Sequence, residues 1–322
     1  MSLMFDISGL SHIELRVKDI DRSLKYYRDT LGMIVVENTR SGTLLKCNEE
    51  SLFFSIKLVQ WDAPGLDHMS FKVPSEDDLE IIAELCKENK IEYKTTKEPH
   101  ITKSIRFQDP AGFPVEFSTG IERNDFHHED YKNMRGAFPL RLDHITVHTT
   151  LMDQAINFYK NKLSFIETEE IQKDHKQITG IFLARGRTTH DIAFFRASGP
   201  AVHHIAIRVR DIEDIIRICD ILGSQNLIDQ IEYGPGRHRA TNGLFIYTRD
   251  PDGNRIELFT GDYYIDGSDW KPLIWQEEYR RIELWGHLPP PGFRTEKTRV
   301  FNVFSGNIEN YVSIKGEEPI SL

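Results

Sequence analysis

The sequence predicts an α+β fold in which one unit, made of a strand, a helix and several short strands, occurs four times. An alternating segment at residues 9–17 precedes an amphipathic helix pattern, and the same combination returns 132 residues later, as His12 is followed by His144. Two further copies begin at His68 and His204, which are 136 residues apart. Self-similarity of this kind indicates repeated supersecondary units, here paired into two halves.

Local signals define the helix of each unit. Asp19 and Ser75 are residue types that cap helix N-termini, and apolar residues with helical spacing follow. In the first and third units these apolar positions are Ile20, Leu24, Tyr27 and Leu31, and Met152, Ile156, Tyr159 and Leu163. In the second and fourth units the predicted helices extend from Ser75 to about Asn89 and from about Asp211 to Ser224.

A repeated turn closes each half of the chain. The sequence Asp-Pro-x-Gly stands at residues 109–112 and again at residues 250–253, and a strand pattern follows each copy. The expected domains are 1–120 and 141–261, with two units each, joined by a polar linker, 121–140. The remaining residues, 262–322, form a tail rich in Trp, Tyr and Pro. It is expected to pack on the sheet or on a neighbouring subunit, or to form a lid.

Length and composition are those of a globular two-domain protein. The 322 residues are 39% hydrophobic and 28% charged, which argues against disorder. A net charge of -10 repels phosphate, so nucleic acid is not an expected partner. The 3 cysteines are far apart in sequence, which favours a reducing cytoplasm. No apolar run approaches the ~18 residues of a membrane span, so no membrane association is expected.

Two histidines and one glutamate occupy matching positions in the C-terminal half. His144 and His204 begin strands, and Glu257 lies on the last strand between two apolar residues. A carboxylate on an interior face needs a charge or a metal beside it. Two imidazoles and one carboxylate would bind one side of a divalent metal and leave positions open, as in non-haem Fe(II) oxygenases. The N-terminal half has the same residue types at His12, His68 and Glu116, so the triad alone does not decide which half holds the metal.

The residues around the two triads differ. His190, His238 and Tyr247 precede the ligands of the C-terminal triad, and all three can move protons. The positions at the same spacing in the N-terminal half are Phe54, Lys97 and Arg106. This asymmetry predicts a catalytic metal-binding domain at 141–261 and a structural domain at 1–120.

The C-terminal motif carries a family resemblance. Residues 234–238, Gly-Pro-Gly-Arg-His, are followed by Tyr247 and by the run DPDGNRIELFTGDYY. This pattern resembles the type I extradiol ring-cleavage dioxygenases of the vicinal oxygen chelate superfamily, over residues 8 to about 290. The similarity is closest to the catechol 2,3-dioxygenases (metapyrocatechases) and to the homoprotocatechuate 2,3-dioxygenase branch.

The resemblance implies a fold, a reaction and a set of roles. The fold would be four βαβββ modules paired into two open, barrel-like domains, as in the glyoxalase and bleomycin resistance proteins. The implied metal ligands are His144, His204 and Glu257; the implied catalytic residues are His190, His238 and Tyr247. The implied metal is Fe(II), with Mn(II) as the alternative, and the reactants are a catechol and O2. A homo-oligomer, such as a homotetramer, is also implied.

Four substrate-binding positions follow from comparison with the family pattern. Thr146 stands where the homoprotocatechuate branch has Asn, Phe182 replaces a Trp, and Tyr233 replaces an Arg. Loss of that arginine removes a partner for a substrate carboxylate, although Arg280 or Arg281 is a candidate replacement. The expected reaction is therefore extradiol cleavage of catechol, or of an alkyl or aryl catechol, to a 2-hydroxymuconic semialdehyde. The alternatives are homoprotocatechuate or 2,3-dihydroxybiphenyl as substrate, a glyoxalase-type isomerase, and a metal-free binding protein.

Two further histidines lie next to the ligands. His148 is expected on the same strand face as His144 and so to line the cavity or to pack in the core. His203 is expected to point away from the site, because it directly precedes the ligand His204.

Overall fold

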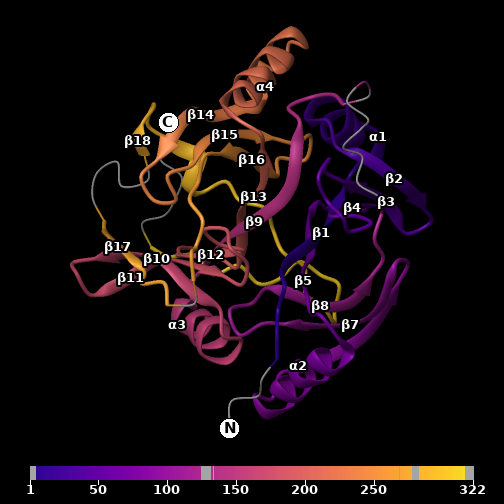
Figure 1. The fold of residues 1–322 in the computed structure, drawn as a ribbon, viewed down its shortest axis with the longest axis vertical. Coiled ribbons are helices and arrows are strands. Elements are labelled where there is room, and N and C mark those ends of the chain that lie inside the picture. Colours follow the sequence, from indigo (N-terminus) through magenta and orange to yellow (C-terminus); the bar gives the residue numbers. More distant parts are fainter. Residues whose placement is uncertain (1–4, 125–131, 133, 268, 278–282, 316–322) are drawn as a thin grey trace.

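The computed structural model describes residues 5–124, 132, 134–267, 269–277 and 283–315. Within these ranges the chain forms two curled mixed sheets, one in each half, with helices on their outer sides (Figure 1). The first module contains β1 (Gly9–Val17), α1 (Ile20–Leu24), η1 (Lys25–Leu31), β2 (Ile34–Thr39), β3 (Gly42–Lys46) and β4 (Ile56–Gln60). The second contains β5 (Gly65–Lys72), α2 (Glu76–Glu88), β6 (Tyr93–Glu98), β7 (Ile101–Gln108) and β8 (Pro114–Ile121).

The C-terminal half repeats this order. Its first module contains β9 (Pro139–Thr149), α3 (Met152–Ile156), η3 (Asn157–Lys162), β10 (Ile166–Lys173), β11 (Gln177–Ala184) and β12 (Ile192–Arg196). Its second contains β13 (Ala201–Val209), α4 (Ile212–Ser224), η4 (Ile228–Gln230), β14 (Ile231–His238), β15 (Leu244–Arg249) and β16 (Arg255–Thr260). The tail adds β17 (Leu273–Gln276), β18 (Glu283–Trp285) and η5 (Pro291–Arg294).

The two sheets have the same strand order. In the described residues it is β2-β3-β4-β1-β5-β8-β7-β6 in the first sheet and β10-β11-β12-β9-β13-β16-β15-β14 in the second, with β17 and β18 added at its two edges. In each half the central strands pair in the same sense, antiparallel for β1 with β5 and β9 with β13, and parallel for β5 with β8 and β13 with β16. The predicted fold of four βαβββ modules is confirmed.

The helix caps also agree with the sequence. The side chain of Asp19 accepts a hydrogen bond from the backbone N–H of Arg22, and Ser75 and Asp78 form a capping box at the start of α2. The predicted first helix differs in one respect, because α1 continues as the π-helix η1. Tyr26 and Tyr27, neighbours in this π-helix, are both buried.

The tail packs against both sheets. β17 runs parallel to β10, β18 pairs with β14, and further along the chain Val300 bridges to Leu66 in the N-terminal half (Figure 1). Part of the predicted linker, residues 125–131 and 133, lies outside the described residues. One cluster of buried apolar side chains extends through both halves, so the halves share a core.

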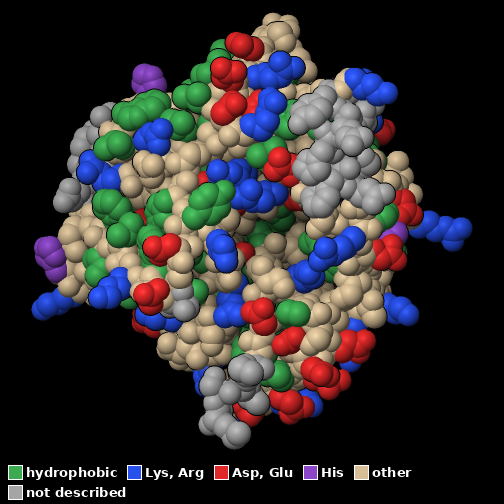
Figure 2. Space-filling model, in the orientation of Figure 1, with side chains coloured by type: hydrophobic (Ala, Val, Ile, Leu, Met, Phe, Trp, Pro, Cys, Tyr) green, Lys and Arg blue, Asp and Glu red, His purple; other side chains and the backbone are tan. Residues whose placement is uncertain are grey.

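No helix in the described part of the chain is both long and apolar enough to cross a bilayer. Acidic side chains gather at the lower right of the face in Figure 2, over α2, whose first turn contains Glu76, Asp77 and Asp78. Negative charge at a helix N-terminus is favourable, because it faces the positive end of the helix dipole.

Candidate metal centre and active site

The three predicted ligands meet on the inner face of the C-terminal sheet. His144 on β9 is paired with Ala206 on β13, and Ala206 is paired with Glu257 on β16. His204 lies two residues before Ala206, so its side chain points to the same face. Because Ala206 has only a methyl group, it leaves space between the three ligand side chains.

The ligand atoms converge on one point. Oε2 of Glu257 lies 3.4 Å from Nε2 of His144 and 3.0 Å from Nε2 of His204. All three side chains are buried. Their donor atoms lie within 4.8 Å of one another, which is the spacing of atoms that share one metal ion.

Two neighbouring side chains orient the histidines. Nδ1 of His144 lies 3.1 Å from Oδ2 of Asp143, a carboxylate that can only accept, so Nδ1 carries a proton and Nε2 is the nitrogen that can bind a metal. Nε2 of His203 is 2.9 Å from the carbonyl oxygen of Phe293 and donates to it. His203 therefore accepts at Nδ1 from Nδ1–H of His204, at 2.7 Å. This again leaves a lone pair on Nε2 of the ligand.

The position of His203 corrects the sequence-based expectation. It was expected to point away from the site, but it lines the same cavity as His204 and holds that ligand in place. The pairing of β13 with β9 shifts register between Val202 and His204, which breaks the simple alternation of faces. The pattern of one strand read alone does not reveal such a shift.

The charges of the centre favour a cation. Burial acts to raise the pKa of Glu257, but the adjoining His204 and hydrogen bonds from the surrounding histidines hold it well below its ordinary value. Burial acts to lower the pKa of His144, whereas the carboxylates of Asp143 and Glu257 raise it to about 9. A buried carboxylate with positive charge held beside it is the environment that a divalent ion occupies, so these residues fit a metal.

The three predicted catalytic residues surround the same centre. The ring of His190 lies 3.9 Å from the ring of His144. Nε2 of His238 is 3.0 Å from the hydroxyl of Tyr247 and 3.2 Å from Oε1 of Glu257. The cross-strand pairing of Tyr247 with Glu257 places its ring next to the ligands.

Burial sets the protonation of two of these groups. Desolvation, together with the neighbouring His144 and His204, holds the pKa of His190 well below its ordinary value, so this imidazole is neutral. Desolvation and the neighbouring Glu257 carboxylate hold the pKa of Tyr247 well above its ordinary value, so the phenol keeps its proton. The neutral imidazole of His190 and the protonated phenol of Tyr247 therefore face the same space beside the three ligands.

The centre opens into a cavity of about 340 Å³, which is near the lower end of the range for small-molecule sites. Thr146, Phe182 and His148 line it together with the ligands and the three proton-handling residues. The ring of Phe182 meets the ring of His190 edge to face, 5.0 Å between centroids.

One predicted substrate-binding residue lies away from the cavity wall, and the position of another is not described. Tyr233 is not among the cavity-lining residues; its ring stacks behind Tyr247, 5.9 Å between centroids, and its hydroxyl donates to Glu283. The sequence comparison placed Tyr233 at the substrate, but the structure shows it supporting the wall behind it. Arg281 lies outside the described residues.

The tail supplies lining residues that sequence reasoning missed. Phe293, Arg294 and Ile314 all border the cavity, although they lie outside the repeated modules. No periodic signal marks them, since the tail has no second copy in the chain. Tail residues therefore form part of the site as well as packing on the sheet.

The fold and the site define a class. The sequence model of the Glyoxalase/Bleomycin resistance protein/Dioxygenase superfamily matches residues 9–117 and 141–258, and the chain belongs to this superfamily. Within the class, the manganese-dependent 2,3-dihydroxybiphenyl 1,2-dioxygenase of Geobacillus genomosp. 3 is 27% identical, over 87% of this chain and 94% of that protein. A metapyrocatechase of Pseudomonas sp. (strain CF600) is 29% identical, over 82% of this chain and 89% of that protein.

Solved structures agree with these relatives. Homoprotocatechuate 2,3-dioxygenase from Brevibacterium fuscum, in its anaerobic complex with 3,4-dihydroxyphenylacetate, superimposes with a TM-score of 0.92 at 29% identity and covers 97% of this chain and 98% of that one. The Arthrobacter globiformis enzyme of the same name gives a TM-score of 0.91 at 29% identity, covering 95% and 96%.

Proposed function

We propose that this protein is an extradiol dioxygenase that opens a catechol ring with O2 next to one hydroxyl group, giving a 2-hydroxymuconic semialdehyde. One observation carries the proposal. His190, His238 and Tyr247 surround the open side of a His-His-Glu centre, and the N-terminal copy of that centre lacks all three residue types at the matching positions. A centre that only held a metal for structure would have no use for them.

The metal would be Fe(II), or Mn(II) as in the named Geobacillus relative, held by His144, His204 and Glu257. When bound, it supplies positive charge and open positions at which the two oxygens of a catechol and O2 are brought together.

The side chains of this chain handle the protons. His238 takes a proton from a catechol hydroxyl, while Tyr247, which stays protonated, donates a hydrogen bond to the substrate oxygen. His190, neutral and packed against the ligand His144, holds or delivers the proton needed as the O–O bond breaks. The apolar ring of Phe182 borders the cavity beside His190 and helps to exclude water there.

The preferred substrate is proposed to be catechol, or a catechol with a neutral alkyl or aryl group. The wall near the centre is formed by Phe182, Phe195 and Phe259, whereas the cations Lys173 and Arg294 also border the cavity. Arg294 is exposed, so its charge is screened by water. Homoprotocatechuate and 2,3-dihydroxybiphenyl, the substrates named for relatives, are the alternatives.

We also propose a cytoplasmic homo-oligomer, such as a tetramer. The edge strands β17 and β18 expose Leu273, Ile274, Leu284 and Trp285, which are 41%, 58%, 52% and 45% accessible in the isolated chain. Apolar side chains on open sheet edges favour contact with another subunit. All three cysteines are free, as expected in a reducing compartment. Light scattering on the purified protein measures the number of subunits.

Oxygen uptake by the anaerobically purified, metal-analysed protein tests the main proposal. Catechol, 3-methylcatechol, homoprotocatechuate and 2,3-dihydroxybiphenyl form the substrate panel. Catechol-dependent O2 consumption with a yellow product supports it. A metal-containing protein that ignores O2 would instead support the glyoxalase-type isomerase, and a metal-free, inert protein would support a binding function. The Glu257→Ala variant is expected to lose the metal of this site together with all oxygen uptake.

A further inference from the structure

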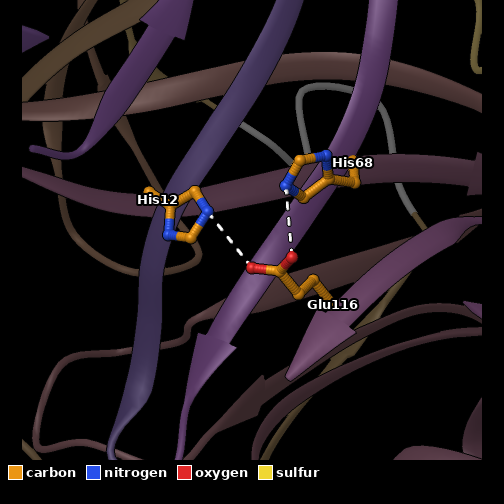
Figure 3. A group of neighbouring side chains, drawn as sticks. All are labelled: His12, His68 and Glu116. Atoms are coloured by element: carbon orange, nitrogen blue, oxygen red, sulfur yellow. Dashed lines mark ion pairs between the residues drawn. The ribbon is translucent and has the colours of Figure 1, made fainter. Parts of the chain in front are cut away.

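A second group of two histidines and one glutamate lies inside the N-terminal half. His12 on β1, His68 on β5 and Glu116 on β8 point toward one another from neighbouring strands (Figure 3). Nε2 of His12 is 3.4 Å from Oε1 of Glu116, and Nε2 of His68 is 3.8 Å from Oε2. The strand register matches the catalytic half, because His12 pairs with Ser70 and Ser70 pairs with Glu116. At most 1% of each of the three residues is exposed.

Hydrogen bonds determine the tautomer of His68. Its Nδ1 lies 2.9 Å from Oδ1 of Asp67, whose other oxygen accepts from Arg16. A carboxylate in an ion pair only accepts, so Nδ1 of His68 carries the proton. In the neutral ring Nε2 then keeps its lone pair, and this buried atom has no hydrogen-bond partner among the described residues.

The tautomer of His12 follows in the same way. Ser11 Oγ donates its single proton to the carbonyl oxygen of Ser70, at 2.9 Å. It can therefore only accept from Nδ1–H of His12, which is 3.2 Å away. Nε2 of His12 keeps a lone pair that faces Glu116 and likewise has no partner in the described part of the chain.

Two lone pairs and a carboxylate thus meet in the buried interior of the N-terminal half. One added proton would satisfy only one of the two Nε2 atoms, and two added protons would place two imidazolium ions beside the guanidinium of Arg106. One divalent cation satisfies all three groups at once. We propose that His12, His68 and Glu116 bind a second divalent first-row transition metal ion, separate from the catalytic one.

The cationic side chains near Glu116 leave its Oε1 atom available to a metal ion. Arg106 donates to Oε2 of Glu116 at 2.6 Å and also contacts Glu98, which offsets its charge. Within the described part of the chain, Oε1, which faces His12, accepts a hydrogen bond from Ser70 Oγ and retains a second lone pair. His68 could also share a metal ion with the carboxylates of Glu14 and Glu98. Lys57 already bridges these two carboxylates, because its Nζ is 2.9 Å from Glu14 and 2.8 Å from Glu98.

The second ion would be structural. Phe54 packs against His12 at 4.8 Å, whereas His190 packs against His144 in the catalytic half. Arg106 is paired with Glu116 across the strands, in the place that Tyr247 takes beside Glu257. Among the described residues, this centre has no counterpart of His190 or Tyr247 beside its ligands, so the ion would tie β1, β5 and β8 together.

Metal analysis of the full chain, purified anaerobically with Fe(II) or Mn(II) supplied, tests the proposal. We expect about two ions per chain in the wild type and about one in His68→Gln, which should keep catechol-dependent oxygen uptake. Glu257→Ala should also hold about one ion but have no oxygen uptake, and the double variant should hold none. One ion in the wild type and none in Glu257→Ala would overturn the proposal.

A crystal of the wild type gives the same answer without any substitution, in case His68→Gln fails to fold. An anomalous difference peak recorded at the metal absorption edge should lie between His12, His68 and Glu116. Its absence in a crystal whose catalytic site shows such a peak would contradict the second site. Failure of the proposed dioxygenase activity would show separately, as absent oxygen uptake whatever the number of ions.

Discussion

The hydroxyl group of Tyr159 donates a hydrogen bond to Oδ2 of Asp109 at 2.8 Å, and this contact joins the two halves of the chain. Tyr27 makes the reciprocal contact with Asp250 at 2.9 Å. Each tyrosine lies in the π-helical turn of one half, and each aspartate opens the Asp-Pro-x-Gly turn of the other. The internal repeat therefore also creates the symmetric contacts by which the halves bind each other.

Removing either hydroxyl should destabilise the protein. We expect Tyr159→Phe and Tyr27→Phe each to lower the free energy of unfolding by about 1–3 kcal/mol, because a buried carboxyl loses a hydrogen-bond donor. Urea unfolding followed by circular dichroism measures the change. Tyr264→Phe is the matched control, since Tyr264 is 61% exposed and should change little. If all three variants are as stable as the wild type, the two Tyr–Asp hydrogen bonds between the halves contribute nothing to stability.

The same aspartates predict a pH dependence of stability. Burial raises the pKa of Asp109 and of Asp250 to about 6, above the value of about 3.9 in an unfolded chain. The stability that these carboxyls contribute is therefore present below about pH 4 and is lost as the pH rises through about 6. Relative to wild type, Asp109→Asn should gain about 3 kcal/mol of unfolding free energy between pH 4 and pH 7.

Urea unfolding at three pH values across this range measures that gain. Asp220→Asn on the exposed side of α4 serves as the control and should run parallel to wild type. If the unfolding free energy of Asp109→Asn changes with pH in the same way as that of the wild type, Asp109 does not have a raised pKa.

Replacing His190 should separate metal binding from catalysis. His190→Phe copies the residue that packs against His12 in the other half, so it should fit the fold and leave the metal content unchanged. Turnover should fall by about 10²–10⁴-fold, because a proton-transfer group is lost. Steady-state oxygen uptake measures the turnover of His190→Phe, and metal analysis of the same sample measures its metal content. Wild-type turnover in this variant would remove His190 from the mechanism.

His203 should control metal affinity without touching the metal. His203→Ala removes the acceptor that fixes Nδ1–H of His204, so Nε2 is no longer held as a free lone pair. We expect the affinity for Mn(II) to fall by about 10–100-fold, as measured by titration of the metal-free protein. His175→Ala, at an exposed position, should bind as wild type does. An unchanged dissociation constant for His203→Ala would assign it a packing role only.

Arg294 distinguishes the substrate alternatives. Because an exposed cation contributes at most about 1 kcal/mol, Arg294→Ala should change kcat/KM for catechol less than about fivefold. We expect neutral catechols to remain the better substrates in both proteins. A strong preference of the wild type for homoprotocatechuate that disappears in Arg294→Ala would show instead that this arginine binds a substrate carboxylate. Oxygen-uptake kinetics of both proteins measure kcat/KM for catechol and for homoprotocatechuate.

Much of the site could be predicted because its residues occur twice. Comparison of the two halves separated His190 and Tyr247 from Phe54 and Arg106, and the strand pairing of Tyr247 with Glu257 places that tyrosine at the centre. The prediction was wrong for His203, because a register shift between β13 and β9 changes the direction of its side chain. It also misplaced Tyr233, which lies behind Tyr247 instead of lining the cavity.

The repeated modules, the helix caps such as Ser75, and the residue types of both triads could be predicted because they depend on spacing along one strand or helix. The folded chain was needed to show that Ala206 leaves space between the ligands, that Phe293 and Arg294 border the cavity, and that Tyr159 meets Asp109. Those features depend on strand register and on contacts between segments far apart in the chain. Local propensity carries no information about either, since packing of the whole fold selects them.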